Sequence, residues 1–243
     1  MDSPLTAKRA LVTGGAGPIG WAICKALADD GCVVIAADID EEALNKLCAD
    51  TDGISPQVLD VSDHDAVAKT ADAVGEIDIL VNNAGVLSNN KSATTNAQEW
   101  RRVMSINLDG AFYMAQAFLP GMRKRKWGRI INMASLAMKA GGITAGTAYT
   151  TSKGGMAALT FSLAREVAGD GVTVNAIAPA YVMTPMVSEQ LSAAQREKLL
   201  GDIPVKRFCE PLEVAHAARF LASPLAGFIT GEIIDVNGGL HFD

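Results

Sequence analysis

Tyr149 and Lys153, four residues apart, are of the types and at the spacing that acid–base chemistry needs. They lie in a segment of helical pattern, 148–169, where residues at i and i+4 share one face. A free tyrosine has a pKa of about 10 and is a poor base near neutral pH. A nearby ammonium favours the phenolate, so the pair predicts a tyrosine of lowered pKa that exchanges a proton with a substrate. The alternative is a half-buried tyrosine beside a solvated lysine.

A glycine-rich stretch after the first apolar run has the pattern of a phosphate-binding loop. Residues 13–20 read TGGAGPIG, and 15–20 match G-x-G-x-x-G. Glycines allow a tight turn and a close approach of the backbone to a pyrophosphate, which then faces a helix N-terminus. We expect Pro18 in the first turn of that helix, where a missing N–H costs little. The alternative is a glycine turn that binds no ligand.

Asp38 ends the second apolar run, CVVIAAD. A carboxylate there can accept hydrogen bonds from an adenosine ribose diol and repels a 2′-phosphate. The glycine loop contains no Lys or Arg, and Ile39 follows Asp38. These features favour NAD over NADP as cofactor. The alternative is that Asp38 caps a helix beginning near Glu41.

Short apolar, β-branched runs alternate with longer segments of helical period along the whole chain. This alternation predicts one doubly wound α/β domain, 1–243, with a parallel sheet and helices on both faces. Segment 187–210 is polar, interrupts the alternation and is predicted to be a substrate flap. Ligands of such sheets bind beyond the carboxyl ends of the strands. The expected strands are 9–13, 32–37, 56–60, 77–82, 129–134, 172–178 and 232–236, and the expected helices are 18–30, 41–50, 63–74, 97–124, 148–169 and 211–222.

Composition excludes several classes of partner. The 243 residues carry a net charge of −6, which does not suit binding to nucleic acid or to an anionic membrane. The start of the chain lacks a secretory pattern, and the longest uncharged run, 172–188, contains prolines and makes a poor membrane helix. The four cysteines have no metal-ligand spacing. We therefore expect a cytoplasmic, metal-free protein with reduced thiols.

Other polar residues receive no functional role at this point. The three histidines (His64, His216, His241) carry no motif and are expected to be surface or packing residues. The basic run 123–126 is expected to be a solvated helix end, where cations complement the helix dipole.

Four further motifs join the glycine loop in order along the chain: LDV at 59–61, NNAG at 82–85, Ser135, and the Tyr149–Lys153 pair. Together they resemble the short-chain dehydrogenase/reductase family over essentially the full length. The resemblance implies a Rossmann-type sheet of about seven parallel strands, a nicotinamide cofactor, and a homo-oligomer, usually a tetramer, with a dimer as the alternative.

The resemblance also implies roles by position. In the catalytic set, Ser135 holds the substrate oxygen and Asn107 supports a water that leads from the lysine to solvent; the set is Asn107, Ser135, Tyr149 and Lys153. The implied cofactor residues are Gly14, Gly17, Pro18, Ile19, Asp38, Asp60, Val61, Asn83, Ala84, Gly85, Tyr149, Lys153, Pro179, Val182 and Thr184. The substrate pocket is expected to include Ala137, Met138, Thr144, Tyr181 and Met186, mostly apolar side chains that suit a moderately apolar secondary alcohol or ketone.

Simpler alternatives remain open at several of these positions. Ser135 could be a turn hydroxyl, Asn107 a side chain that bonds to backbone within a helix, and the NNAG stretch a capped turn that holds strands together. Two departures from the family pattern also stand out. Pro18 replaces the middle glycine of the loop, so we expect Gly17 to absorb an unusual backbone angle. Ala180 replaces the glycine after Pro179, a change expected to reshape the nicotinamide and substrate side of the pocket.

The sequence therefore predicts an NAD-dependent oxidoreductase that interconverts a secondary alcohol and a ketone. One alternative is a nucleotide-binding regulatory protein that keeps the fold without turnover. Another is a different nicotinamide enzyme, such as an epimerase or dehydratase, although the larger substrate domain usual in those enzymes is missing.

Overall fold

The computed structural model describes residues 5–184 and 192–242. Within these ranges, seven strands form one parallel sheet in the order β3-β2-β1-β4-β5-β6-β7. The order reverses between β1 and β4, which is where a doubly wound sheet opens its ligand crevice. The strands are β1 (Arg9–Thr13), β2 (Val33–Asp38), β3 (Ile54–Val58), β4 (Ile79–Asn82), β5 (Gly128–Met133), β6 (Val172–Pro179) and β7 (Ile233–Val236).

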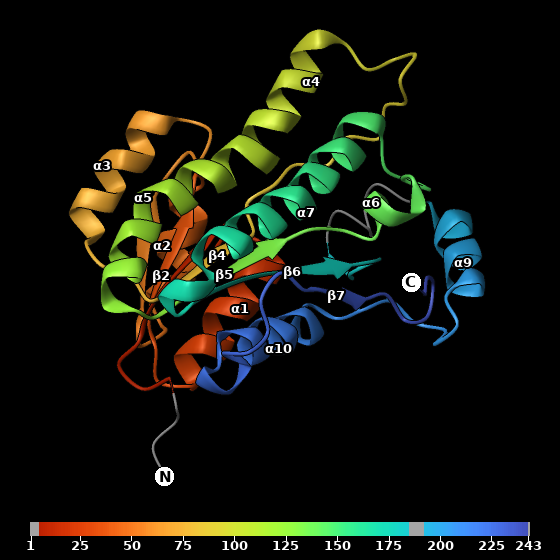
Figure 1. Cartoon of the computed structure of the whole chain (residues 1–243). Coiled ribbons are helices and arrows are strands. Elements are labelled where there is room, and N and C mark those ends of the chain that lie inside the picture. Colours follow the sequence, from red (N-terminus) through yellow and green to blue (C-terminus); the bar gives the residue numbers. More distant parts are fainter. Residues whose placement is uncertain (1–4, 185–191, 243) are drawn as a thin grey trace.

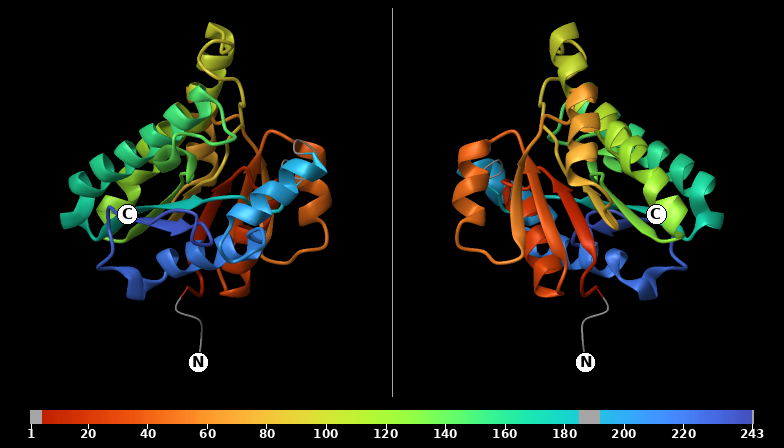
Figure 2. Two further views of the ribbon diagram at one scale, coloured as in Figure 1. Left: turned by 90° about the vertical axis from the view of Figure 1, so that its right-hand side faces the viewer. Right: turned by 90° about the vertical axis from the view of Figure 1, so that its left-hand side faces the viewer.

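Helices cover both faces of the sheet (Figures 1 and 2). The helices are α1 (Pro18–Asp29), α2 (Glu41–Cys48), α3 (His64–Val74), α4 (Ala97–Met104), α5 (Gly110–Arg125), α6 (Ala137–Ala140), α7 (Thr147–Val167), α9 (Ala193–Asp202) and α10 (Pro211–Ala222). A π-helical turn, η1 (Ser105–Asp109), joins α4 to α5, and short 3₁₀ turns lie at η2 (Ala168–Asp170) and η3 (Pro224–Ala226).

Alternate side chains of each strand feed two separate cores. On β1, Ala10 and Val12 pack with α1, α2 and α10, whereas Leu11 packs with α3, α5 and α7. Strands buried on both faces read as continuous apolar runs, which is why β1, β4 and β6 were visible in the sequence. The predicted fold class is confirmed.

Three local differences from the sequence prediction have physical reasons. Strand β3 begins at Ile54, two residues earlier than expected, and tolerates Pro56 because it lies at the sheet edge. The helix expected over 97–124 is interrupted by the π-helical turn η1, whose extra residue per turn is invisible to a 3.6-residue period. Of the expected flap, the structure describes α9, which starts with a capping box between Ser192 and Gln195, while residues 185–191 lie outside the described ranges.

Candidate active site

The glycine loop joins β1 to α1 by a turn that depends on two close approaches. Gly14 has φ of +65°, and a Cβ on it would lie 2.8 Å from Nδ2 of Asn83. A Cβ on Gly20 would overlap the carbonyl oxygen of Gly14, so the first turn of α1 can pack on the loop only with glycine there. Pro18 stands at the first position of α1, as predicted. The expectation for Gly17 is wrong: its φ of −75° is ordinary, because the unusual angle is taken up at Gly14.

Asp38 ties the glycine loop to the end of β2. Its Oδ2 accepts from the backbone N–H of Ala16 at 3.0 Å, and Oδ1 accepts from that of Asp40 at 3.2 Å. The cap of α2 is Asp40, whose carboxylate accepts from Ala43 N–H at 3.0 Å, so the alternative of Asp38 as a helix cap is wrong. A carboxylate offers about four acceptor sites, which leaves Asp38 able to accept further hydrogen bonds.

The NNAG turn after β4 is bound to the end of β1. Asn83 donates from Nδ2 to the carbonyls of Thr13 and Gly14 at 3.0 and 3.1 Å, and from its backbone N–H to the Thr13 hydroxyl at 3.0 Å. Ala84 N–H donates to the same hydroxyl at 3.0 Å. The turn therefore holds two strands together, which was the simpler alternative. A cofactor contact for Asn83, Ala84 and Gly85 stays a prediction.

The two residues after β3 differ in exposure. Asp60 is exposed, and its Oδ1 accepts from the backbone N–H and hydroxyl of Ser62 at 2.9 and 2.7 Å. Val61 is buried and packs against Gly110. Their role toward an adenine stays a prediction.

Ser135, Tyr149 and Lys153 converge at the carboxyl ends of β5 and β6. Ser135 follows β5, and Tyr149 lies in the first turn of α7. The Ser135 hydroxyl accepts from the backbone N–H of Ala137 at 3.2 Å and lies close enough to the Tyr149 phenol to influence its pKa. Lys153, one turn further on, is 3% exposed, donates to the carbonyl of Met133 at 2.6 Å and lies 5.7 Å from the centre of the Tyr149 ring. The i, i+4 geometry predicted from the sequence is present.

Burial dominates the electrostatics of this pair. It raises the pKa of Tyr149 above its ordinary value, although the Ser135 hydroxyl acts in the opposite direction. Burial also lowers the pKa of Lys153 to about 8. The predicted lowering of the tyrosine pKa is wrong for this structure, because removing both groups from water disfavours the charged form of each.

Asn107 lies on the π-helical turn η1 and is fully buried. Its Nδ2 donates to Val86 O at 3.0 Å and to the Ser152 hydroxyl at 3.1 Å, and its Oδ1 accepts from Val86 N–H at 2.8 Å. Asn107 therefore does bond to backbone, but to the loop residue Val86 rather than within its own helix, and it also bonds to a side chain. Gly85 adjoins both groups of the expected relay, since a Cβ there would lie 3.3 Å from Asn107 Oδ1 and 3.5 Å from Lys153 Nζ. The water relay itself stays a prediction.

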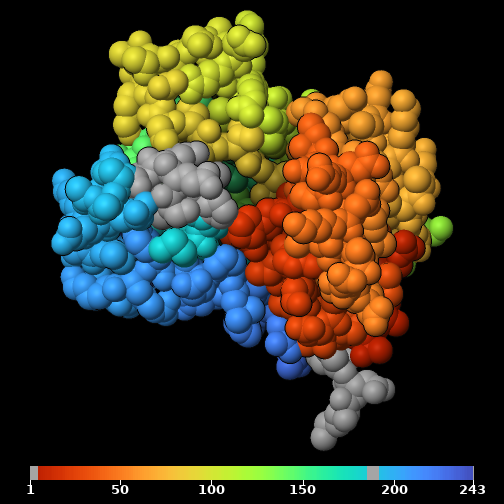
Figure 3. Space-filling model, turned by 180° about the vertical axis from the view of Figure 1, so that it is seen from behind, coloured from red at the N-terminus to blue at the C-terminus, as the bar shows by residue number. Residues whose placement is uncertain are grey.

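A cavity of about 420 Å³ lies above Ser135 and Tyr149. Its walls come from the loops after β4, β5 and β6 and from α6, α7 and α9. Seen from behind in Figure 3, the surface is hollowed between the yellow and the red-to-orange parts of the chain. The lining residues are Leu87, Asn89, Ser135, Leu136, Ala137, Ala140, Ile143, Thr144, Ala145, Tyr149, Ala180, Tyr181 and Gln195.

The predicted pocket residues divide into three groups. Ala137, Thr144 and Tyr181 line the cavity, and the Thr144 hydroxyl lies 3.4 Å from that of Tyr181 in a hydrogen bond. Met138 does not line it: its side chain packs against a small cluster formed by Ala134, which follows β5, and by Ala176 and Ala178 of β6. Met186 lies outside the described residues.

The sequence prediction missed Leu87 and Asn89, which line the cavity and belong to no motif. Ala180 also lines the cavity, where its effect was expected, and Gln195 comes from the segment 187–210 that was predicted to be a substrate flap. The signal for Leu87 and Asn89 was their place just after the NNAG turn, at the carboxyl end of a strand.

The last group of predicted cofactor residues follows β6. Pro179 ends that strand, and its carbonyl accepts from Leu136 N–H at 2.9 Å. Val182 is buried and forms an isolated parallel bridge with Cys209, while Thr184 is the last residue before the undescribed segment. Their contacts with a cofactor stay predictions.

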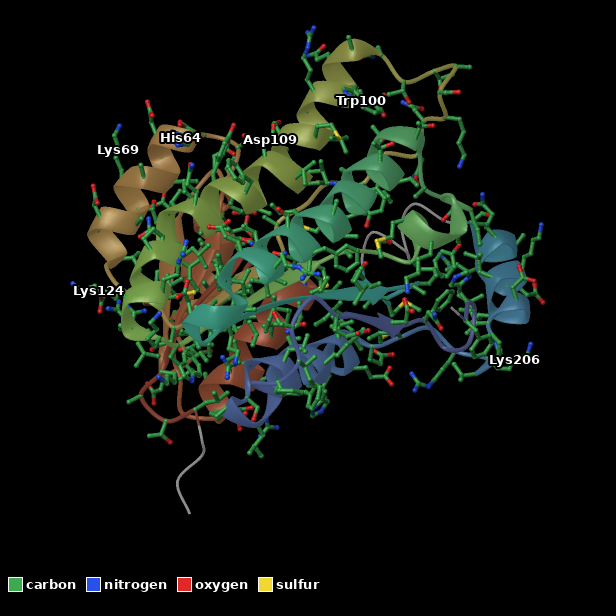
Figure 4. The ribbon with its side chains drawn as sticks, in the orientation of Figure 1. His64, Lys69, Trp100, Asp109, Lys124 and Lys206 are labelled. Atoms are coloured by element: carbon green, nitrogen blue, oxygen red, sulfur yellow. The ribbon has the colours of Figure 1, made fainter. Side chains whose placement is uncertain are left out.

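The remaining polar groups lie away from this site. The basic end of α5 is ion-paired rather than simply solvated: Arg123 and Lys126 contact Asp170 at 2.8 and 2.6 Å. His64 lies on α3 (Figure 4), does not line the cavity, and packs edge-on against Tyr113. Over residues 5–184 and 192–242, no three His, Cys, Asp or Glu side chains are grouped to hold a metal, and no helix has the length and apolarity to cross a membrane.

Comparisons with known proteins extend over almost the whole chain. Residues 14–241 match the family model described as enoyl-(acyl carrier protein) reductase. The chain is 38% identical to a 3-oxoacyl-[acyl-carrier-protein] reductase FabG of Thermotoga maritima, covering 97% of this chain and 98% of that protein. It is 40% identical to an acetoacetyl-CoA reductase of Rhizobium meliloti, over 96% and 98%. The crystal structure of gox2181 superposes with a TM-score of 0.92 at 32% identity, covering 98% of both chains.

Proposed function

The chain belongs to the short-chain dehydrogenase/reductase family, and we propose that it is an NAD-dependent oxidoreductase that interconverts a ketone and a secondary alcohol. One observation carries the proposal: Ser135 and Tyr149 both line a cavity of about 420 Å³, with the buried Lys153 one helical turn behind Tyr149. The reductases of similar sequence act, by their names, on 3-oxoacyl and acetoacetyl groups, which supports ketone reduction as the direction to test first.

The nucleotide side of the site fits a dinucleotide. No side chain among the described residues caps the N-terminus of α1, so its first amides can face a diphosphate. The glycine loop brings backbone close to that helix end, and Asp38 can accept hydrogen bonds from a ribose diol. Bound there, a nicotinamide supplies the hydride or accepts it.

Tyr149 moves the proton in this scheme. In reduction its phenol donates to the substrate oxygen, and in oxidation its phenolate accepts the hydroxyl proton. Its raised pKa keeps the phenol protonated at neutral pH, which suits the donor role. The Ser135 hydroxyl, which lines the same cavity, holds the substrate oxygen beside the phenol.

Lys153 and Asn107 support the proton donor from behind. Lys153, with a pKa of about 8, is cationic below that pH and stabilises the phenolate left after donation. Asn107 lies beside Gly85, next to the ammonium, where it can hold a water that restores the proton.

Asp38 is the basis for preferring NAD over NADP. Its carboxylate stands at the end of β2 and would meet a 2′-phosphate as a like charge. The cavity is lined mainly by apolar side chains with a few hydroxyl and amide groups, so a moderately apolar ketone suits it.

The remaining expectations stay part of the proposal. They are a homo-oligomer, tetramer or dimer, in the cytoplasm, and a substrate flap over 187–210. The contribution of Gln195 from α9 to the cavity wall supports the flap.

The direct test is a cofactor absorbance assay over a panel of ketones, run with NADH and with NADPH, and with secondary alcohols in reverse. The proposal expects NADH to be consumed in step with formation of a secondary alcohol. A protein that binds NADH but consumes none would indicate the regulatory alternative. Product formation without net change in cofactor would indicate an epimerase or dehydratase.

A further inference from the structure

One wall of the substrate cavity is a glycine-hinged loop that leads directly into the Tyr149 helix. Ile143, Thr144 and Ala145 line the cavity, and α7 begins two residues later at Thr147. The loop starts with two successive left-handed glycines, 141 and 142, with φ of +69° and +71°. Such residues retain many accessible conformations, so the loop needs contacts from elsewhere to keep one shape.

Lys91 supplies these contacts from a distant part of the chain. Its Nζ donates to the carbonyls of Gly142 and Ala145 at 2.6 and 2.7 Å, so that the two bonds flank the cavity-lining residues 143 and 144. Hydrogen bonds from an ammonium are stronger than those between neutral groups. The lysine therefore bridges the two ends of the wall.

Backbone contacts from the same segment dock the start of α7. Gly146 N–H donates to Ser88 O at 2.6 Å, and Thr147 N–H donates to Asn90 O at 3.0 Å. These bonds satisfy amides at a helix N-terminus that lacks a side-chain cap. The segment 88–91 thus contacts both the cavity wall and the helix that carries Tyr149.

Glu99 on α4 anchors the segment in turn. Its carboxylate accepts from the Ser88 hydroxyl and, at 2.8 Å, from Nδ2 of Asn90. These hydrogen bonds lower the pKa of Glu99, so the carboxylate is ionised at neutral pH. The Thr95 hydroxyl adds bonds to the carbonyls of Asn90 and Lys91, each at 3.0 Å. These hydrogen bonds therefore hold the backbone that carries Lys91 in one position.

We propose that Lys91 is a positioning residue that sets the shape of the substrate cavity and thereby its selectivity for compact over bulky ketones. The inference rests on the proposed reductase function. Without the ammonium, the wall between the two glycines and α7 loses its bridge. The Thr144–Tyr181 hydrogen bond, at 3.4 Å, remains on the cavity side but is long for a bond between hydroxyls.

The test compares Lys91→Met with Lys91→Arg, whose guanidinium can still donate to two carbonyls. Lys69→Met serves as the control, because Figure 4 shows Lys69 on the outer side of α3. Two readouts are measured: kcat/KM for a compact and a bulky ketone, and amide hydrogen exchange of residues 141–149.

For Lys91→Met we expect the bulky-to-compact ratio of kcat/KM to rise about tenfold, and exchange in 141–149 to quicken by a similar factor. Lys91→Arg and Lys69→Met should keep the wild-type ratio and exchange rates. A general loss of stability would lower both kcat/KM values together and leave their ratio unchanged. An unchanged ratio in Lys91→Met overturns the inference, whatever the exchange rates show.

An inactive wild-type protein is a separate outcome. It would overturn the proposed function and, with it, the claim about selectivity. The exchange rates would still decide whether Lys91 holds the wall, since unchanged rates in Lys91→Met would contradict the clamp itself.

Discussion

On the β1–β4 side of the site, short side chains at strand ends bond directly to the neighbouring strand, as Asn83 does to Thr13 and Gly14. On the α7 side, the cavity wall is held by Lys91, which reaches across from the segment after β4. The first arrangement is part of the sheet itself, whereas the second is built on loops. From this difference we expect changes in the loops to alter the substrate pocket and leave nucleotide binding unchanged. Changes at the strand ends should alter nucleotide binding and leave the substrate pocket unchanged.

The largest effect that would sharpen this comparison is expected at Lys153. Replacing it with Met removes the buried cation behind Tyr149, so turnover should fall about 100-fold or more, in line with losses in general acid–base catalysis. Steady-state kinetics with saturating NADH measure the loss. Lys124→Met, at the far end of α5 in Figure 4, is the matched control and should leave turnover unchanged.

A second effect should be confined to the nucleotide side. Asp38→Ser removes the charge that faces a 2′-phosphate, so the preference for NADPH over NADH should rise by at least about tenfold, as judged from kcat/KM for each cofactor. Asp40→Ser is the control, since serine can still cap α2. A wild-type protein that already prefers NADPH would contradict the role given to Asp38.

The pH profile separates the two directions of reaction. Lys153 carries its charge below its pKa of about 8, and Tyr149, with a raised pKa, is protonated over the same range. The rate of ketone reduction should therefore hold at neutral pH and decline as pH rises above about 8, while alcohol oxidation should increase. Initial rates in both directions from pH 6 to 10 test this, and parallel profiles would contradict it.

The smallest effect concerns stability rather than catalysis. Asn83→Ala removes the side-chain donor to the carbonyls of Thr13 and Gly14, of which Gly14 O still accepts from Gly17 N–H at 3.2 Å, so the free energy of unfolding should fall by about 1 kcal/mol. Urea denaturation measures the change. Asn45→Ala, on the exposed face of α2, should alter it by less than about 0.5 kcal/mol.

The same contrast explains how far the sequence could be interpreted. Strand ends and the glycine loop were predictable because a parallel sheet forces apolar runs, turn glycines and strand-end polar groups into fixed order. Asp38 and the Tyr149–Lys153 spacing followed from such local rules. The backbone angle expected at Gly17 was wrong because the positive φ falls at Gly14, where a Cβ would come too close to Asn83 and Ala84.

Long-range contacts account for what the sequence did not reveal. Asn89 lines the same cavity as Gln195, and Lys91 donates to the carbonyl of Ala145, although no local sequence pattern predicts either arrangement. Met138 is an apolar residue three positions after Ser135, yet its side chain packs against alanines of β6 instead of lining the cavity. The direction of the Tyr149 pKa also depended on burial, which opposes the ammonium expected from spacing alone.

The most direct test of the central claim, that Tyr149 exchanges the proton at this cavity, is Tyr149→Phe measured for NADH affinity and for turnover on one preparation. The hydroxyl is removed while the ring remains, so NADH dissociation constants should stay within about twofold of wild type and turnover should fall by about 100-fold or more. Undiminished turnover in this variant would contradict the assignment of the proton donor and the mechanism built on it.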